Sequence, residues 1–243
     1  MAFVIGTHEM KALVKRLFAM AGLGVYRVGA SQNNNSHTPV VLSPIHHNSK
    51  EGLEAFYSNR EAVESYLDPA FYERIIDLGL TFGVGYDEKR IADIGCGTGG
   101  LLKALKNRFR PSSLTGFEYS EKAIDIARSQ VPDVEFCYFD IYEGSVRQFD
   151  VIFCVEVLEH LLHPDTALRN VIGMLADSGT VLVTVPNGRI DTFDGHINFW
   201  SPESWNVFLK NACAGLSVKT GLIEDGQNNY AVITKSESLV IAN

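Results

Sequence analysis

Apolar runs and amphipathic stretches alternate along most of the chain after residue 89. Five runs rich in branched and aromatic residues are predicted to be strands, at 91–94, 114–117, 134–139, 149–155 and 180–185. Stretches with apolar positions at helical spacing separate most of these runs. Strands that alternate with helices predict a parallel sheet with helices on both faces.

The C-terminal part adds one helix and two strands to this pattern. Ser201, Pro202 and Glu203 have the residue types expected at the N-cap and the first two positions of a helix. Residues 216–222 and 230–235 are predicted to be strands on either side of a turn. The pattern therefore predicts an α/β sheet of seven strands.

The segment before the sheet is predicted to be helical. Residues 51–82 contain two predicted helices that divide near Asp68 and Pro69. Asp68 is a good N-cap residue, and proline is favoured at the first helical position because its fixed φ suits a helix start. These helices lead directly into the first predicted strand.

The first part of the chain has a different character. Residues 8–23 have apolar positions at helical spacing, which predicts an amphipathic helix, and residues 29–50 are polar and read as a loop. We therefore divide the chain into an N-terminal helix-and-loop extension, 1–50, and a main domain, 51–243. We expect the extension to pack on the domain or on a second subunit, so a homodimer is one expected arrangement.

A strand, a glycine turn and a helix follow one another in residues 90–105. The turn has the spacing Gly95-x-Gly97-x-x-Gly100, which also satisfies the dinucleotide-binding fingerprint. Glycine permits positive φ and close approach of a ligand, and the helix start offers unpaired N–H groups. Asp93 lies at the end of the strand, where a buried carboxylate needs a partner. A ligand with an ammonium group would supply one.

Two further acids end the next two predicted strands. Glu118 lies 18 residues after Gly100, close to the offset at which an acid meets ribose hydroxyls in nucleotide-binding folds. Asp140 closes the third predicted strand. Because the carboxyl ends of parallel strands meet at one edge of the sheet, these acids are expected near the glycine turn.

The run Asp93-x-Gly95-x-Gly97-x-Gly99 resembles the signature of class I S-adenosylmethionine-dependent methyltransferases. The resemblance covers about residues 51–236. It implies a Rossmann-like, doubly wound, seven-stranded sheet that is mostly parallel, with an antiparallel last strand. It also implies S-adenosyl-L-methionine as cofactor, with its amino-acid end held by the acid and the glycines.

The same resemblance suggests roles for residues around the turn. In the family, an acid at the position of Asp140 meets the adenine amino group, and the backbone of the next residue, here Ile141, meets the ring. Cys96 and Tyr119 are ordinary family variants at cofactor-binding positions. Helices before the glycine turn cover the cofactor in the family, so Tyr57 is a candidate contact.

Two downstream stretches bear on the methyl acceptor. Residues 156–160, Glu-Val-Leu-Glu-His, resemble a stretch in small-molecule methyltransferases such as the ubiquinone-biosynthesis O-methyltransferases. Acids after a central strand lie at the ligand-binding rim, so Glu156 is counted with the cofactor residues. The loop 186–200 is similar to one in methyltransferases of sugar-modifying pathways. We therefore expect O-methylation of a small molecule, a sugar or a phenol.

The chemistry of methyl transfer makes modest demands on the protein. A sulfonium methyl group is already activated, so we expect no covalent nucleophile and no metal ion. The protein must hold donor and acceptor about 3–3.5 Å apart and in line. It must also remove the proton of a hydroxyl acceptor.

Histidine, with an unperturbed pKa of about 6.5, is the side chain best suited to that proton. His196 is the first candidate, because it lies on the long loop after the fifth strand, near Phe199 and Trp200, which could form a wall for the acceptor. His160 is the second candidate, because it follows the fourth strand. For both, a hydrogen bond or packing contact that only orders the structure is an open alternative.

Composition narrows the class of partner and the compartment. The formal net charge of −8 argues against nucleic acid, whose phosphates require a basic surface. The four cysteines have no zinc-ligand or redox spacing, which predicts a reducing, cytoplasmic environment. No apolar run approaches the ~20 residues of a membrane-spanning helix.

Two other functions are also compatible with the sequence. A nicotinamide-dependent oxidoreductase would use the same glycine turn and Glu118, although Asp93 and Asp140 count against it. A non-catalytic module with the same fold could bind the cofactor without turnover. Preference for NAD, or cofactor binding without turnover of any acceptor, would identify these alternatives.

Overall fold

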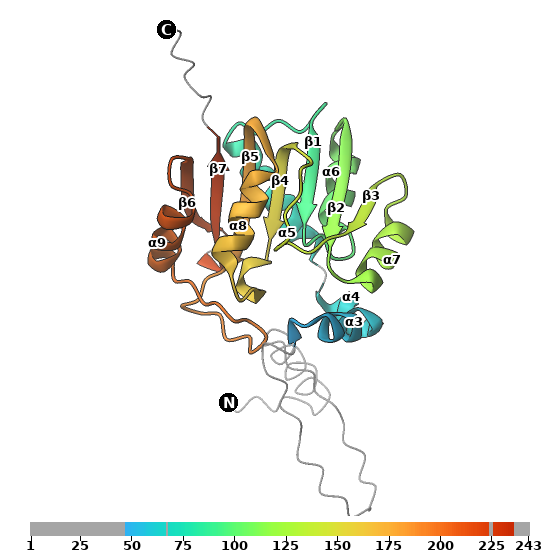
Figure 1. Cartoon of the computed structure of the whole chain (residues 1–243). Helices are drawn as coiled ribbons and strands as arrows, with labels where there is room; N and C mark the ends of the chain where they lie inside the picture. The colour runs from blue at the N-terminus through green and yellow to red at the C-terminus, as the bar shows by residue number, and fades with distance from the viewer. Residues whose placement is uncertain (1–46, 67, 224–225, 236–243) are drawn as a thin grey trace, which may run out of the picture.

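Seven strands form one sheet in the computed structural model, which describes residues 47–66, 68–223 and 226–235 (Figure 1). The strand order is β3-β2-β1-β4-β5-β7-β6. The strands are β1 (Arg90–Ile94), β2 (Ser113–Glu118), β3 (Glu135–Tyr138), β4 (Phe149–Val155), β5 (Leu175–Pro186), β6 (Ser217–Ile223) and β7 (Asn228–Thr234). Neighbours from β3 to β5 are parallel, whereas β7 pairs antiparallel with both β5 and β6. The predicted seven-stranded, mostly parallel sheet is confirmed.

Helices cover both faces of this sheet, as expected. They are α3 (Lys50–Ser58), α4 (Arg60–Tyr66), α5 (Pro69–Thr81), α6 (Gly100–Arg108), α7 (Glu121–Gln130), α8 (Pro164–Gly173) and α9 (Pro202–Ala212), with a short 3-10 turn, η1 (Leu158–His160). One apolar cluster joins α5, α6 and α7 to the sheet, and a second joins α8 and α9 to the other face. The Rossmann-like, doubly wound arrangement follows from these two layers.

The two apolar clusters come from the alternation of side chains along the strands. Ile91 and Phe153 face α5 and α6, whereas Ala92, Ile94 and Cys154 face α8. All five are at most 2% exposed. Because successive side chains of a strand point to opposite faces, central strands must be apolar at nearly every position. This explains the continuous apolar runs in the sequence.

Several helix starts agree with the sequence prediction. Asp68 accepts a hydrogen bond from Ala70 N, and Pro69 occupies the first turn of α5. Ser120 caps α7 by accepting from Ala123 N, and Ser201 caps α9. These caps act within four residues, which is why the sequence alone locates them.

Two segments differ from the sequence prediction. Residues 51–82 form three helices instead of two, because Asn59 ends α3 and its side chain accepts from Ala62 N at the start of α4. Strand β5 begins at Leu175, five residues earlier than expected, because Leu175 pairs with Phe149 across a register shift.

The N-terminal extension lies almost entirely outside the described residues. The predicted amphipathic helix 8–23 and most of the loop 29–50 belong to the part that the structure does not describe. The division at residue 50 therefore stays a prediction. Among the described helices, none combines the length and the apolar character needed to cross a membrane.

Candidate active site

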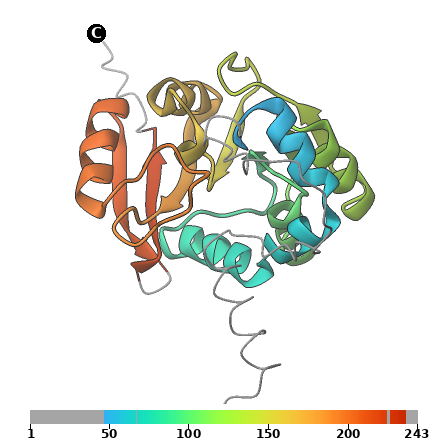
Figure 2. The same cartoon turned by 90° about the horizontal axis from the view of Figure 1, so that it is seen from below.

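A cavity of about 630 Å³ opens at the carboxyl ends of β1, β2 and β4. Seen from below, α3 and α4 lie on one side of these strand ends, and the loop after β5 lies on the other (Figure 2). The cavity is lined by eleven of the twelve residues that the sequence suggests for the site: Tyr57, Asp93, Gly95, Cys96, Gly97, Glu118, Tyr119, Asp140, Ile141, Glu156 and His160. His196 lies next to His160 and does not line the cavity itself.

The glycine turn forms one wall of the cavity. Gly95 has φ +74°, and a Cβ at this position would clash with Val157 Cγ2. Gly97 has φ +51°, and its N–H donates to Glu118 Oε2 at 2.9 Å. Both conformations are in the left-handed region that glycine adopts without strain. The turn therefore presents bare backbone to the cavity.

Glu118 connects the turn to the end of β2. Its Oε1 accepts from Tyr119 N at 2.8 Å and Ser120 N at 2.9 Å, while Oε2 accepts from Gly97 N. Burial raises the pKa of this carboxyl, and the three backbone N–H donors oppose that rise. Each oxygen of a carboxylate has two lone-pair sites, so Oε2 retains a site for a ligand hydroxyl.

Asp93 is the most unusual acid of the cavity. It is 3% exposed, and no hydrogen bond or ion pair to its carboxylate is found within the described part of the chain. Burial, with a smaller contribution from the charge of Glu118, raises the pKa of Asp93 to about 8. A buried acid in this state is suited to a cationic ligand, because a positive charge would restore the ionised form.

The third acid, Asp140, follows β3 at the rim. One carboxylate oxygen accepts from Tyr142 N at 2.9 Å, which leaves the other available to a ligand. The carbonyl of Ile141 accepts from Asn170 Nδ2 at 2.8 Å and is held in place. The Tyr119 ring packs against that of Tyr138 in a tilted arrangement, with ring centroids 5.5 Å apart. Tyr119 and Tyr142 make this part of the cavity lining partly aromatic.

Tyr57 and Cys96 have different relations to the cavity. A Cβ on Gly97 would lie 3.2 Å from the Tyr57 hydroxyl, so α3 closes over the turn. The Cys96 side chain is 7% exposed and packs in the apolar core against Gly116, and burial raises the pKa of its thiol. Cys96 thus contributes its backbone to the cavity and its side chain to the core.

Glu156 follows β4 with φ +54°, an uncommon conformation for a residue with a Cβ. Its oxygens accept from Thr184 Oγ1 at 2.8 Å and Asn228 Nδ2 at 3.0 Å. Burial raises the pKa of its carboxyl to about 7. The strained backbone and the two side-chain donors hold this carboxylate at the cavity wall.

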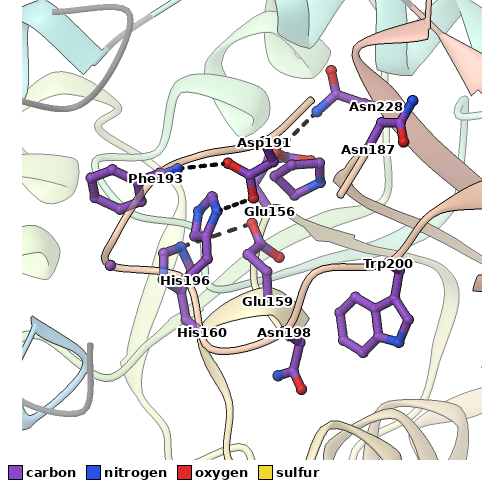
Figure 3. Close-up of polar contacts among 12 residues, drawn as sticks. Glu156, Glu159, His160, Asn187, Asp191, Phe193, His196, Asn198, Trp200 and Asn228 are labelled. Carbon is purple, nitrogen blue, oxygen red and sulfur yellow. Dashed lines mark hydrogen bonds and ion pairs between the residues drawn. The ribbon is translucent and has the colours of Figure 1, made fainter. Parts of the chain in front are cut away.

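A group of acids and histidines lies beside Glu156 (Figure 3). Asp191 Oδ2 and His196 Nδ1 are 2.6 Å apart, with side chains that are 9% and 11% exposed. The His196 ring lies edge-on to that of His160, with centroids 4.7 Å apart. Burial and the neighbouring His196 lower the pKa of His160 to about 3. Glu159, on the same turn as His160, is 1% exposed.

The aromatic residues near His196 are arranged differently from the expectation. Trp200 packs against Trp205 and Phe208 in the core of the α9 face, so it does not form a wall of the cavity. Phe199 is exposed, with its ring centroid 6.2 Å from that of His196. Phe193 takes the expected place, because it lines the cavity and packs on His196 at 4.8 Å.

Several cavity or cluster residues were not singled out from the sequence. Asp191 and Glu159 join the two histidines, and Asn228 reaches Glu156 from the last hairpin. The adjacent pair Glu159 and His160 was a visible signal. No sequence pattern pointed to Asp191 or Asn228, because only the folded loops bring them to the site.

Two curated proteins with similar sequences are named as methyltransferases. The ubiquinone biosynthesis O-methyltransferase of Coxiella burnetii is 29% identical over 111 residues, 43% of this chain and 47% of the relative. The enzyme of the same name from Neisseria meningitidis serogroup C is 30% identical over 107 residues, 41% of this chain and 44% of the relative. The matched stretch spans about half the length of these curated relatives.

Solved structures with the same fold include methyltransferases with bound ligands. NodS, an N-methyltransferase from Bradyrhizobium japonicum solved with S-adenosyl-L-homocysteine, has a TM-score of 0.61 at 20% identity and covers 78% of this chain and 100% of its own. Magnesium protoporphyrin IX methyltransferase from Synechocystis was solved with S-adenosylmethionine. It has a TM-score of 0.57 at 15% identity, and the match covers 82% of this chain and 100% of its own. At these identities the likeness concerns the fold.

A family model, described as methyltransferase domain, matches residues 65–218. The match includes the glycine turn, the three acids at the strand ends and the cluster around His196. It covers more than half of the chain. The chain therefore belongs to the methyltransferase domain family.

Proposed function

We propose that this chain binds S-adenosyl-L-methionine in the cavity and transfers its methyl group to a small-molecule hydroxyl. The observation that carries the proposal is Asp93, a buried carboxylate without a cation partner among the described residues, at the end of β1 beside the glycine turn. A dinucleotide brings phosphates to such a turn, and a buried acid would repel them. An amino-acid ammonium would pair with Asp93.

The remaining cavity residues fit the rest of this cofactor. Glu118 would accept from the ribose hydroxyls through its free lone pairs, and Asp140 would accept from the adenine amino group. The backbone of Ile141 and the ring of Tyr119 would lie along the base. Bound there, the cofactor supplies a sulfonium methyl group that needs no further activation. The chain's own residues position it and exclude water.

Calorimetry with the purified protein tests the cofactor. We expect saturable binding of S-adenosylmethionine and of S-adenosylhomocysteine, and little affinity for NAD. The Asp93→Asn variant is expected to lose affinity for both methionine-derived ligands. Binding of NAD in preference to S-adenosylmethionine would refute the assignment and favour the oxidoreductase alternative.

The acceptor proposed is a hydroxyl of a sugar or a phenol. Two of the similar proteins, from Coxiella burnetii and Neisseria meningitidis, are named O-methyltransferases of ubiquinone biosynthesis, which supports transfer to oxygen. The cavity lining also includes apolar and aromatic side chains, among them Leu161, Tyr142 and Phe193. Such side chains would pack against the face of a sugar or phenol ring.

In this proposed function, one of the two histidines accepts the proton that the acceptor hydroxyl loses. Asp191 accepts at His196 Nδ1, which places a proton on Nδ1 and leaves Nε2 as the acceptor atom. His160 lines the cavity next to His196 and has little tendency to hold a proton, because its pKa is lowered to about 3. We therefore assign the role of general base to His196, with Asp191 as its positioning residue.

A panel of sugars, phenols and amines assayed for transfer of a labelled methyl group tests the acceptor class. We expect product from one of the hydroxyl compounds and none from amines. Cofactor binding together with no turnover across the panel would favour the non-catalytic module. Product from amines alone would refute O-methylation.

A further inference from the structure

Three side chains beside the cavity are arranged as metal ligands. Within the described residues, Glu159, His160 and His196 each present one ligand atom, and these atoms lie within 4.8 Å of one another. Glu159 Oε1 and His160 Nε2 are 3.8 Å apart. Bonds to zinc are about 2.0–2.2 Å long, so ligands of one ion lie at most about 4.4 Å apart. Small side-chain rotations would bring this group to that spacing.

The carboxylate of Glu159 has no partner that explains its burial. It is 1% exposed, and neither oxygen has a hydrogen-bond partner in the described part of the chain. The Nδ1 atom of His160 is also buried without a partner. Buried polar atoms are almost always hydrogen-bonded, and an exception requires an explanation such as an ion.

The surroundings add negative charge and no protein cation. The carboxyl groups of Glu156 and Asp191 lie beside that of Glu159 (Figure 3). No lysine or arginine forms an ion pair with these three acids within residues 47–66, 68–223 and 226–235. A divalent cation would compensate the carboxylates and occupy the unpartnered oxygens.

The residues around the three ligands hold them in place. Asp191 Oδ2 accepts from His196 Nδ1 at 2.6 Å, which directs the free Nε2 away from Asp191. A carboxylate that orients a histidine in this way is a common feature of metal sites. Ile197 N and Asn198 N donate to the Glu159 carbonyl at 2.8 Å and 3.0 Å, so the histidine loop is fixed to the turn that carries Glu159.

We propose that Glu159, His160 and His196 bind one divalent transition-metal ion at the wall of the cavity. Two imidazoles and one carboxylate favour zinc, manganese, iron or cobalt over magnesium and calcium, which prefer oxygen ligands alone. Three protein ligands leave open positions, as in catalytic metal sites. Because His160 lines the cavity, those positions face the space for the acceptor. This proposal departs from the expectation, drawn from the sequence, that methyl transfer here needs no metal ion.

The consequence for catalysis rests on the proposed O-methylation. An acceptor with adjacent oxygens, a vicinal diol or a catechol, would occupy the open positions. The ion lowers the pKa of the coordinated hydroxyl, as it does for bound water. The O–H bond breaks and the proton goes to water. The oxygen then forms the bond to the methyl carbon, and the carbon–sulfur bond breaks with its electron pair returning to sulfur. With an ion bound, His196 is a ligand and the ion replaces it as the group that promotes proton loss.

Metal binding is tested without any assay of activity. The full chain, stripped with a chelator and dialysed, is titrated with Zn²⁺, Mn²⁺, Co²⁺ and Mg²⁺ in a calorimeter, and thermal unfolding is followed with and without each ion. We expect one ion per chain for a transition metal, weaker binding of Mg²⁺, and a rise in Tm with the bound ion, because a ligand that binds only the folded state stabilises it.

Variants locate the ion. Glu159→Gln keeps the side-chain volume and breaks no hydrogen bond, so the protein should fold, and saturable binding should be lost. Asp191→Asn should weaken binding by about 10- to 100-fold, as for other residues that orient a ligand. His163→Ala is the matched control, since His163 is exposed and outside the group, and it should bind as the wild type does.

The proposal fails if the stripped wild type binds none of these ions in a saturable way, or if folded Glu159→Gln binds as tightly as the wild type. Failure of the proposed function has a different signature: an ion binds at this group, but no hydroxyl acceptor is methylated. Methyl transfer that persists at full rate in the presence of chelator would leave the function intact and overturn the role of the ion.

Discussion

Asp93 shows how one residue couples the fold to its ligand. Burial makes ionisation costly, and its pKa rises from 3.8 to about 8 in the folded protein. Between these pH values the unfolded chain has lost a proton that the folded chain keeps. Folding then takes up a proton, so stability falls as pH rises through this window. A bound ammonium group would offset the free-energy cost of ionising Asp93 in the folded protein.

We therefore predict that ligand-free Asp93→Asn is more stable than the wild type at pH 8 and that this advantage shrinks toward pH 4. The amide carries no charge and has no such pH dependence. Urea unfolding of both proteins at pH 5, 6.5 and 8 measures the difference in their free energies of unfolding. An Asp93→Asn protein whose stability follows that of the wild type at every pH would show that the carboxylate is ionised in the cavity.

Glu118 provides a second prediction at the same scale. Losing hydrogen bonds to a charged acceptor costs about 1.5–3 kcal/mol, so Glu118→Ala should weaken binding of S-adenosylmethionine by about 10- to 150-fold. Calorimetry measures the change, and Asp125→Ala, an exposed acid on α7, is the control. Unchanged affinity in folded Glu118→Ala would place the ribose elsewhere.

His196 is the third residue with a defined expectation. His196→Ala should lower turnover by about 10²- to 10⁴-fold, with affinity for S-adenosylmethionine unchanged, because the histidine lies outside the cofactor residues. Single-turnover assays with the hydroxyl acceptor that the panel identifies measure this rate. Near-normal turnover would exclude His196 both as base and as essential metal ligand, whereas a loss leaves metal titration to separate these two roles.

At the scale of elements, helix α3 is attached to the domain through the start of another helix. Glu54 of α3 accepts from Glu121 N at 2.7 Å and Lys122 N at 3.2 Å, at the N-terminus of α7. A negative side chain is favoured there, because the first N–H groups of a helix are unpaired and its dipole is positive. This contact places Tyr57 over the glycine turn.

Glu54→Ala should therefore lower the free energy of unfolding by about 0.5–2 kcal/mol, the usual cost of losing a helix cap. Denaturant unfolding measures the loss. Glu51→Ala, an exposed acid on the same helix, should have a smaller effect. Equal stability of the two variants would mean that the contact between α3 and α7 adds nothing to the fold.

At the scale of the whole molecule, the site is built from segments far apart in the chain. Asn48, before α3, donates to the carbonyl of Gly195 at 2.8 Å, so the first described residues meet the loop after β5. Within the described residues, the segment 47–57 lines the cavity on this side.

We predict that a chain lacking residues 1–46 binds S-adenosylmethionine as tightly as the full chain. Calorimetry on both proteins measures this, with circular dichroism to show that the shortened chain folds. A chain that begins at Lys50 is the comparison, because it also lacks Asn48 and its bond to Gly195. A large loss of affinity in the first, folded truncation would assign a cofactor role to the extension.

The sequence by itself determined the sheet, its helices and the side of the cavity that the glycine turn and the strand-end acids form. Apolar runs, N-caps and the glycine turn act over a few residues, so they can be recognised without the fold. Asp93, Glu118 and Asp140 were predicted to meet because each ends a parallel strand, and the carboxyl ends of such strands share one edge. That reasoning needs only the order of strands and helices.

Only the tertiary structure decided the other side of the site. Asp191 and Glu159 lie 32 positions apart in the sequence, and their place beside the histidines depends on how the loop after β5 folds back onto η1. The early start of β5 and the burial of Trp200 also depend on partners distant in the chain, Phe149 and the helix α9. Contacts of this kind are set by packing and side-chain charge in three dimensions, and no local pattern encodes them.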